Sequence, residues 1–195
     1  MTFSEQQLLS RRQGHAEAWE LRTDTSSDGA ERFGALVQRV VEGVYLESVW
    51  ARPGERELRR AVLDDLVDLF VPERFDLFKR FVMTSPAVLT ETIADNKVDR
   101  EGFHPVLLPG GGRFRHIAMN AAAAERYPPL LVDLTARAVG YDVPWRDDPS
   151  GDTAADLAAN RVGRDFAGYL KAHTVGELAA DDAVKRWLAA RLKAG

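Results

Sequence analysis

The amino-acid sequence predicts an all-α protein, a compact multi-helix bundle with two long loops. Two observations carry this prediction. Apolar residues recur at steps of three and four residues in several long segments, and no segment shows the alternation that is typical of a strand. The chain has 195 residues and is 45% hydrophobic, enough for one sizeable core. We therefore expect a single helical domain over residues 1–195, with N-terminal helices in residues 1–100 and a C-terminal helical part in residues 101–195.

The clearest helical pattern covers residues 30–50. Its apolar positions fall on one stripe of a helix, and they are Phe33, Leu36, Val37, Val40, Val41, Val44, Val49 and Trp50. After a break at residues 51–57 the same period resumes in residues 58–70, and Pro72 sets the end of that second helix. The short connection indicates that the two helices pack antiparallel.

The remaining elements alternate with loops. Four phenylalanine and valine positions in residues 75–82 predict a short helix, and Ser85 with Pro86 has the residue types of a helix start. A loop over residues 95–112 is long enough to raise the question of function. The further predicted helices cover residues 113–126, 130–139, 153–172 and 181–192, with a second loop over residues 140–152.

Composition excludes several classes of function. The formal net charge is -4, so there is no basic field for phosphate neutralisation, and we expect no nucleic acid as the main partner. Cysteine is absent, which removes disulfides, thiolate nucleophiles and cysteine metal sites. The start lacks the pattern of a secretory signal peptide, and no apolar run reaches the roughly 20 residues of a membrane span. We expect a soluble, cytoplasmic protein as synthesised. Export by a specialised secretion system stays open, because it requires neither a secretory signal peptide nor a membrane span.

Residues 110–126 combine three glycines with a polar helix face. In the helix after the glycines, His116 and Asn120 are one turn apart, and Arg113 falls close to the same side. Arg113 and Arg115 lie in the first turn, where the dipole disfavours a cation, so we expect an anion or an acidic neighbour. The glycines do not match a nucleotide-binding loop. The alternative interpretation is a flexible helix entry with a surface or packing histidine.

The next long helix carries a second polar group. Asp156, Asn160 and Arg164 follow at four-residue intervals on one face, where Gly163 and Ala167 would allow another backbone or a ligand to approach closely. The polar residues could instead support one another as a ladder along the helix, with Gly163 serving close helix packing.

Together the two groups form the pattern Arg115-His116-x3-Asn120, then Asp156-x3-Asn160-x2-Gly163-Arg164. This pattern resembles a helical domain at the C-terminal ends of bacterial polymorphic toxins and related secreted proteins. The resemblance covers about residues 112–192. It implies an effector- or toxin-like protein with an antagonist protein as partner, and it implies that the polar residues converge between two antiparallel helices.

Such a convergence has a chemical use. An imidazole held by a carboxylate can act as a general base, an asparagine can orient a carbonyl or water, and an arginine can hold an anionic substrate. We therefore predict hydrolysis or group transfer. The predicted catalytic residues are His116, Asn120, Asp156 and Asn160, and the predicted substrate-binding residues are Arg113, Arg115 and Arg164. One histidine with one aspartate is thin coordination for zinc or calcium, so we expect no metal and no cofactor.

Two other functions stay open. The chain could be a non-catalytic helical interaction module whose polar cluster is a buried hydrogen-bond network that fixes helix register. It could also be a helical small-molecule-binding or biosynthetic protein, with His104, Tyr141 and Trp145 lining a pocket. Geometry separates the first two hypotheses: an enzyme requires the His116 ring in an open cleft near Asp156 or Asn160, whereas a structural network seals it from solvent.

Overall fold

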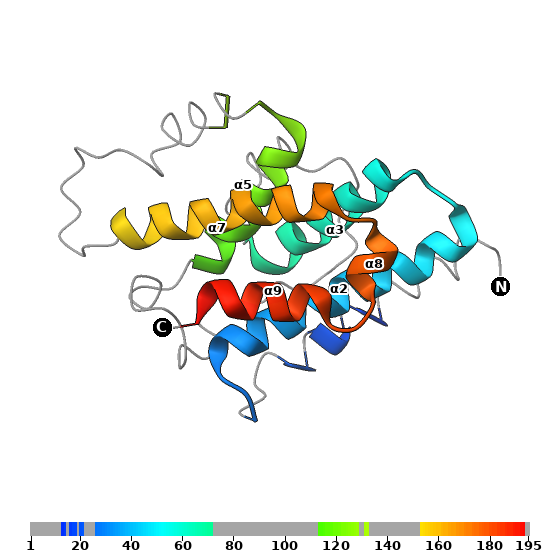
Figure 1. The fold of residues 1–195 in the computed structure, drawn as a ribbon, viewed down its shortest axis with the longest axis horizontal. Coiled ribbons are helices and arrows are strands. Elements are labelled where there is room, and N and C mark those ends of the chain that lie inside the picture. Colours follow the sequence, from blue (N-terminus) through cyan, green and yellow to red (C-terminus); the bar gives the residue numbers. More distant parts are fainter. Residues whose placement is uncertain are drawn as a thin grey trace.

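The computed structural model describes residues 13–14, 16–18, 20–21, 26–71, 113–128, 131–132 and 153–193. The helices labelled in this part are α2 (Gly29–Ala51), α3 (Glu55–Phe70), α5 (Arg113–Arg126), α7 (Thr153–Ala172), α8 (Val175–Ala179) and α9 (Ala183–Leu192). Figure 1 shows α9 lying against α2 while α7 crosses α5, and both pairs are in contact. Because the described residues contain no strand, the predicted all-α class is confirmed.

Helix bounds follow the sequence pattern closely. The prediction for residues 30–50 corresponds to α2, which extends one residue further at each end, and α5 and α7 begin and end where predicted. Helix α3 ends at Phe70, before Pro72. The helix predicted at residues 75–82 and the helix start at residues 85–86 lie outside the described residues.

The C-terminal segment differs from the prediction. The last helix begins at Ala183, because Asp181 and Asp182 adopt left-handed backbone conformations with φ of 52° and 53°. The sequence pattern also missed α8, whose five residues are too few to show a helical period. Its start is fixed by a capping box, in which the hydroxyl of Thr174 accepts from the Glu177 amide and the Glu177 carboxylate accepts from the Thr174 amide.

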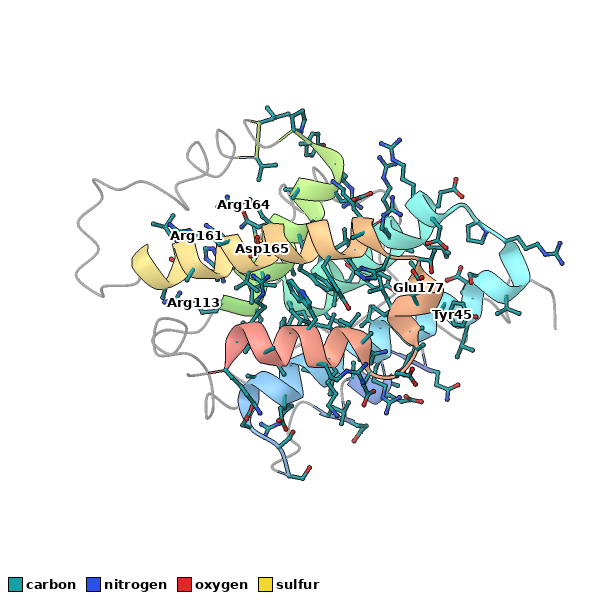
Figure 2. The ribbon with its side chains drawn as sticks, viewed as in Figure 1. Tyr45, Arg113, Arg161, Arg164, Asp165 and Glu177 are labelled. Carbon is teal, nitrogen blue, oxygen red and sulfur yellow. The ribbon has the colours of Figure 1, made fainter. Side chains whose placement is uncertain are left out.

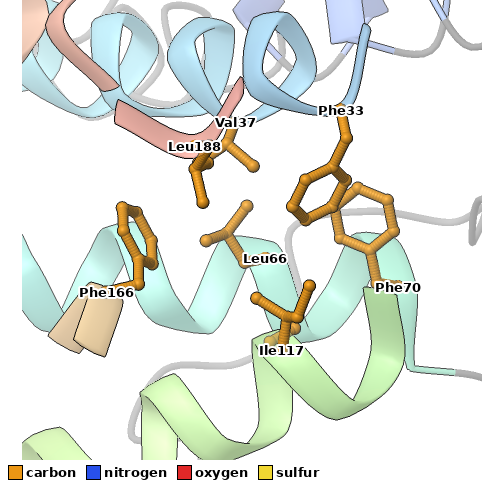
Figure 3. A pocket seen from close by; sticks show the side chains of 8 residues that line it. Phe33, Val37, Leu66, Phe70, Ile117, Phe166 and Leu188 are labelled. Atoms are coloured by element: carbon orange, nitrogen blue, oxygen red, sulfur yellow. The ribbon is translucent and has the colours of Figure 1, made fainter. Parts of the chain in front are cut away.

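The core brings both halves of the chain together. The ring centroid of Phe33, near the start of α2, lies 5.3 Å from that of Phe70 at the end of α3. These two helices therefore run antiparallel, as predicted. Phe33 also stacks on Phe114 of α5, with 4.5 Å between ring centroids. A small apolar gap at this junction is visible in Figure 3, and its lining residues are Phe33, Val37, Leu66, Phe70, Ile117, Ala118, Phe166 and Leu188.

Helices α5 and α7 run in the same direction, which corrects the antiparallel arrangement implied by the resemblance. Arg113, at the start of α5, contacts Asp156 near the start of α7. Further along, Lys171 donates from Nζ to the Ala124 carbonyl oxygen at 2.8 Å. The connection over residues 127–152 is long enough to return the chain to the end from which α5 began.

Gly163 allows these two helices to approach closely. A Cβ built on Gly163 would lie 2.5 Å from the Ile117 carbonyl oxygen and 3.0 Å from the Asn120 Cβ. No larger residue fits without moving a backbone, so the predicted close helix packing at Gly163 is confirmed.

Gln38 of α2 joins the last two helices. Its Nε2 donates to the carbonyl oxygens of Leu178 and Ala179 at 3.2 and 3.3 Å, and its Oε1 accepts from the Val184 and Lys185 amides at 3.0 and 3.3 Å. One buried side chain therefore satisfies backbone groups that the end of α8 and the start of α9 leave open. None of the helices that the structure describes has the length and hydropathy to cross a bilayer.

Candidate functional site

Five of the seven predicted site residues meet where α5 and α7 pack together. Arg113, His116 and Asn120 come from α5, one turn apart along one face, and Asp156 and Asn160 come from α7. The predicted contacts between the two polar groups thus exist, and they cross from one helix to the other.

The centre of the cluster is a pair of amide side chains. Asn120 Nδ2 donates to Asn160 Oδ1 at 2.6 Å and to the backbone carbonyl oxygen of His116 at 3.0 Å. The same Asn160 Oδ1 lies 3.1 Å from Nδ1 of the His116 ring. Both hydrogens of the Asn120 amide are therefore used inside the protein.

The other ring nitrogen faces the carboxylate. His116 Nε2 lies 3.5 Å from Asp156 Oδ1, longer than an ordinary hydrogen bond. The same oxygen forms an ion pair with the Arg113 guanidinium. The acidic neighbour expected for Arg113 is thus Asp156, and this ion pair offsets the unfavourable position of a cation at the start of α5.

Burial divides the cluster into an inner part and an edge. The residues His116 and Asn160 are 4% and 0% exposed, whereas the Asp156 side chain is 20% exposed. The structure meets one of the two conditions for an enzyme: the His116 ring lies beside Asp156 and Asn160, but it is buried rather than in an open cleft, and burial is what the network hypothesis predicts. Among these residues of the cluster, the Asp156 side chain is the most exposed.

The two remaining arginines lie further out. Arg115 of α5 and Arg164 of α7 are half-buried, and both have interaction partners. Figure 2 shows Arg164 with Arg161 on α7, and Arg113 at the start of α5. Of the pocket residues considered for a small-molecule protein, His104, Tyr141 and Trp145 all lie outside the described residues.

A second charged cluster, which sequence analysis did not single out, lies at the other end of α5. Arg126 forms an ion pair with the buried Asp64 of α3, and Glu125 lies 3.8 Å from Arg59 and 3.4 Å from Lys171 of α7. Burial lowers the pKa of Arg126, although Asp64 acts in the opposite direction. Periodicity gave no signal for this cluster, because Asp64 lies on the side of α3 away from the apolar residues that predicted the helix.

Within the described ranges, no group of three histidine or acidic residues is placed to hold a metal ion. Fold and site thus define an all-α protein with buried His and Asn side chains and a half-buried Asp between two parallel helices. Comparisons of the chain with protein-family models, with curated proteins and with solved structures found no match. The toxin-domain resemblance therefore stays a prediction.

Proposed function

We propose that this chain is an effector-type, toxin-like enzyme that catalyses hydrolysis or group transfer, with His116 as its general base. The single observation that carries the proposal is how the ring is held. Nδ1 of His116 contacts the amide oxygen of Asn160, which also accepts a hydrogen bond from Asn120. Nε2 faces the Asp156 carboxylate without a short hydrogen bond to it. A positioned imidazole with one anchored nitrogen is the arrangement that general-base catalysis uses.

The neighbours have complementary roles in this proposal. Asp156 stabilises the imidazolium that forms when Nε2 takes a proton from water or a hydroxyl group, and Arg113 holds that carboxylate in place. The nucleophile enters beside Asp156, because this side chain is the most exposed one of the cluster. Arg115 and Arg164, both half-buried on the same helices, bind the anionic part of the substrate.

An effector of this type acts on a cell and is restrained by an antagonist protein. The test is induced expression in a bacterial host at matched protein level, comparing wild type with His116→Ala and with His173→Ala. His173 is the control because it is a half-buried histidine just after the C-terminal end of α7, where it packs on Tyr169.

Growth arrest by wild type and by His173→Ala, relieved only by His116→Ala, supports the proposal. The melting temperature of each variant is measured alongside, because a large loss of stability in His116→Ala would explain the relief without catalysis. Absence of arrest with wild type contradicts the toxin-like effector.

A second candidate, the non-catalytic interaction module, is favoured by a separate observation. Tyr45, Leu46 and Val49 of α2 are 40%, 52% and 57% exposed, while the polar cluster is buried as a register-fixing network would be. This candidate predicts that partner binding survives His116→Ala and Arg164→Ala but is lost when Leu46→Glu places a charge on the exposed face. Binding that follows His116 instead contradicts it.

A further inference from the structure

We propose that Asn120, acting through Asn160, is a positioning residue that fixes the His116 ring with a proton on Nδ1. The catalytic meaning of this proton rests on the proposed function, since it decides which nitrogen serves as the base. The hydrogen-bond chain itself is a property of the fold. It begins at the backbone carbonyl of His116 and returns to the ring of the same residue.

The first step sets the orientation of Asn120. The carbonyl oxygen of His116 lies 3.0 Å from the Asn120 amide, and a carbonyl oxygen can only accept a hydrogen bond. The nitrogen of the Asn120 side chain must therefore point toward it, because the opposite orientation would place two oxygens against each other in a buried site. Asn120 sits one helical turn after His116, the spacing that makes this contact available.

The second step sets the orientation of Asn160. The second hydrogen of Asn120 Nδ2 points to Asn160 at 2.6 Å, so the atom of Asn160 that faces it must be the oxygen. That oxygen has two lone pairs. One accepts from Asn120, and the other faces His116 Nδ1 at 3.1 Å.

The third step sets the ring. Because Asn160 Oδ1 only accepts, His116 Nδ1 must carry the hydrogen. Nε2 is then the nitrogen that gains or loses a proton, and it is the one that faces Asp156 of α7 and, through that carboxylate, Arg113 of its own helix. The neutral ring presents a lone pair at Nε2, which the general-base step needs.

Close packing makes the chain of hydrogen bonds rigid. A Cβ on Gly163 would lie 3.0 Å from the Cβ of Asn120, so α7 reaches α5 only because Gly163 has no side chain. At that separation the 0% exposed Asn160 reaches both Asn120 and the ring of His116 directly.

The test reads the ring nitrogens directly. In protein labelled with ¹⁵N-histidine, two-bond ¹H–¹⁵N correlation spectra distinguish a protonated ring nitrogen from an unprotonated one. The chain has four histidines, and the His116 signals are those missing from His116→Gln. His173 is an internal reference, because its Nδ1 lies 2.9 Å from the Tyr169 carbonyl oxygen and must donate there.

For wild type we expect a protonated Nδ1 on His116 at every pH at which the protein is folded, with Nε2 alone losing its proton as the pH rises. An unprotonated Nδ1 in the neutral ring would overturn the proposal. This measurement needs no substrate, and His116→Gln serves only to assign the signals.

Two matched substitutions test the role of Asn120. Asn120→Asp and Asn160→Asp each replace an amide by a carboxylate in the same buried contact, yet we expect opposite results. In Asn120→Asp the residue at position 120 can only accept, so Asn160 turns its Nδ2 toward that carboxylate and toward Nδ1 of His116. Nδ1 must then accept a hydrogen bond, and the proton of the neutral ring moves to Nε2. With an acceptor at position 160, Nδ1 keeps its proton. If Nδ1 stays protonated in both, Asn120 does not set the ring.

Circular dichroism identifies a variant that fails to fold, and Asn120→Ala then replaces Asn120→Asp. Without the donor at position 120, we expect the neutral ring to populate both protonation sites, and an unchanged Nδ1–H form overturns the proposal. The outcome is independent of growth arrest. If Nδ1 of His116 carries the proton but the protein causes no growth arrest, the proposed function is contradicted and the role of Asn120 is supported. If the protein causes arrest but the proton is found on either ring nitrogen, the role of Asn120 is contradicted and the proposed function is supported.

Discussion

The space that a Cβ of Gly163 would need is occupied by the carbonyl oxygen of Ile117, which lies 2.5 Å from that position. This contact sets the distance between α5 and α7 and therefore the reach of every polar side chain between them. Because the obstructing atom belongs to a helix backbone, it cannot move aside as the end of a flexible side chain could.

Gly163→Ala should therefore destabilise the fold, although alanine is the better helix former. We expect a loss of roughly 1–3 kcal/mol, as for other overpacked cores, measured as the free energy of unfolding in urea. The control is Gly168→Ala on the same helix, where the new Cβ meets nothing within 4 Å. That variant should gain up to about 1 kcal/mol from helix propensity. Equal effects of the two substitutions would contradict the close contact.

The Asn120 and Asn160 amides should be energetically coupled. Replacing either residue by alanine leaves a buried partner without its hydrogen bond, which costs roughly 1–3 kcal/mol for each group left unsatisfied. In a double-mutant cycle, the second substitution should cost less than it does alone, because its partner has already been removed. Additive losses in urea unfolding would show that the hydrogen bond between the two side chains contributes little to stability.

Gln38 should contribute to stability through the ends of α8 and α9. Gln38→Leu keeps the size of the side chain but removes the groups that bond the Leu178 carbonyl and the Val184 amide. We expect a loss of at least about 2 kcal/mol in the free energy of unfolding, because several buried backbone groups lose partners. The control Gln13→Leu, whose amide bonds only the exposed Glu17, should change stability by less than about 0.5 kcal/mol.

Arg52 ends α2 in a left-handed conformation, with φ of 47°. This conformation is costly for a residue with a Cβ and free for glycine, so Arg52→Gly should raise the melting temperature, with a gain of up to about 1 kcal/mol. Arg56→Gly, in an exposed part of α3, should lose about 1 kcal/mol because glycine is a poor helix former. A lower melting temperature for Arg52→Gly would show that the arginine side chain matters more than the backbone strain.

Among the described residues, the sequence predicted α2, α3, α5 and α7 well because their signal is local. In α2 and α3 the apolar residues repeat with the helical period, and in α7 the same is true of the face that carries Phe166. The candidate site was also visible in part: spacing alone placed His116 and Asn120 on one side of α5 and Asp156 and Asn160 on one side of α7. Helix α8 was missed because capping by Thr174 and Glu177, rather than periodicity, defines so short a helix.

What the sequence by itself determined is which side chains share a helix face, because that depends only on the geometry of one helix. Tertiary structure decided the rest. The parallel direction of α5 and α7 depends on the path of a long connection, and the burial of His116 depends on how the helices pack. The direction of each hydrogen bond from Asn120 to Asn160 to His116 depends on two helices being held together at Gly163. The spacing of residues along one helix cannot predict these contacts, because they form only where a second helix packs against the first.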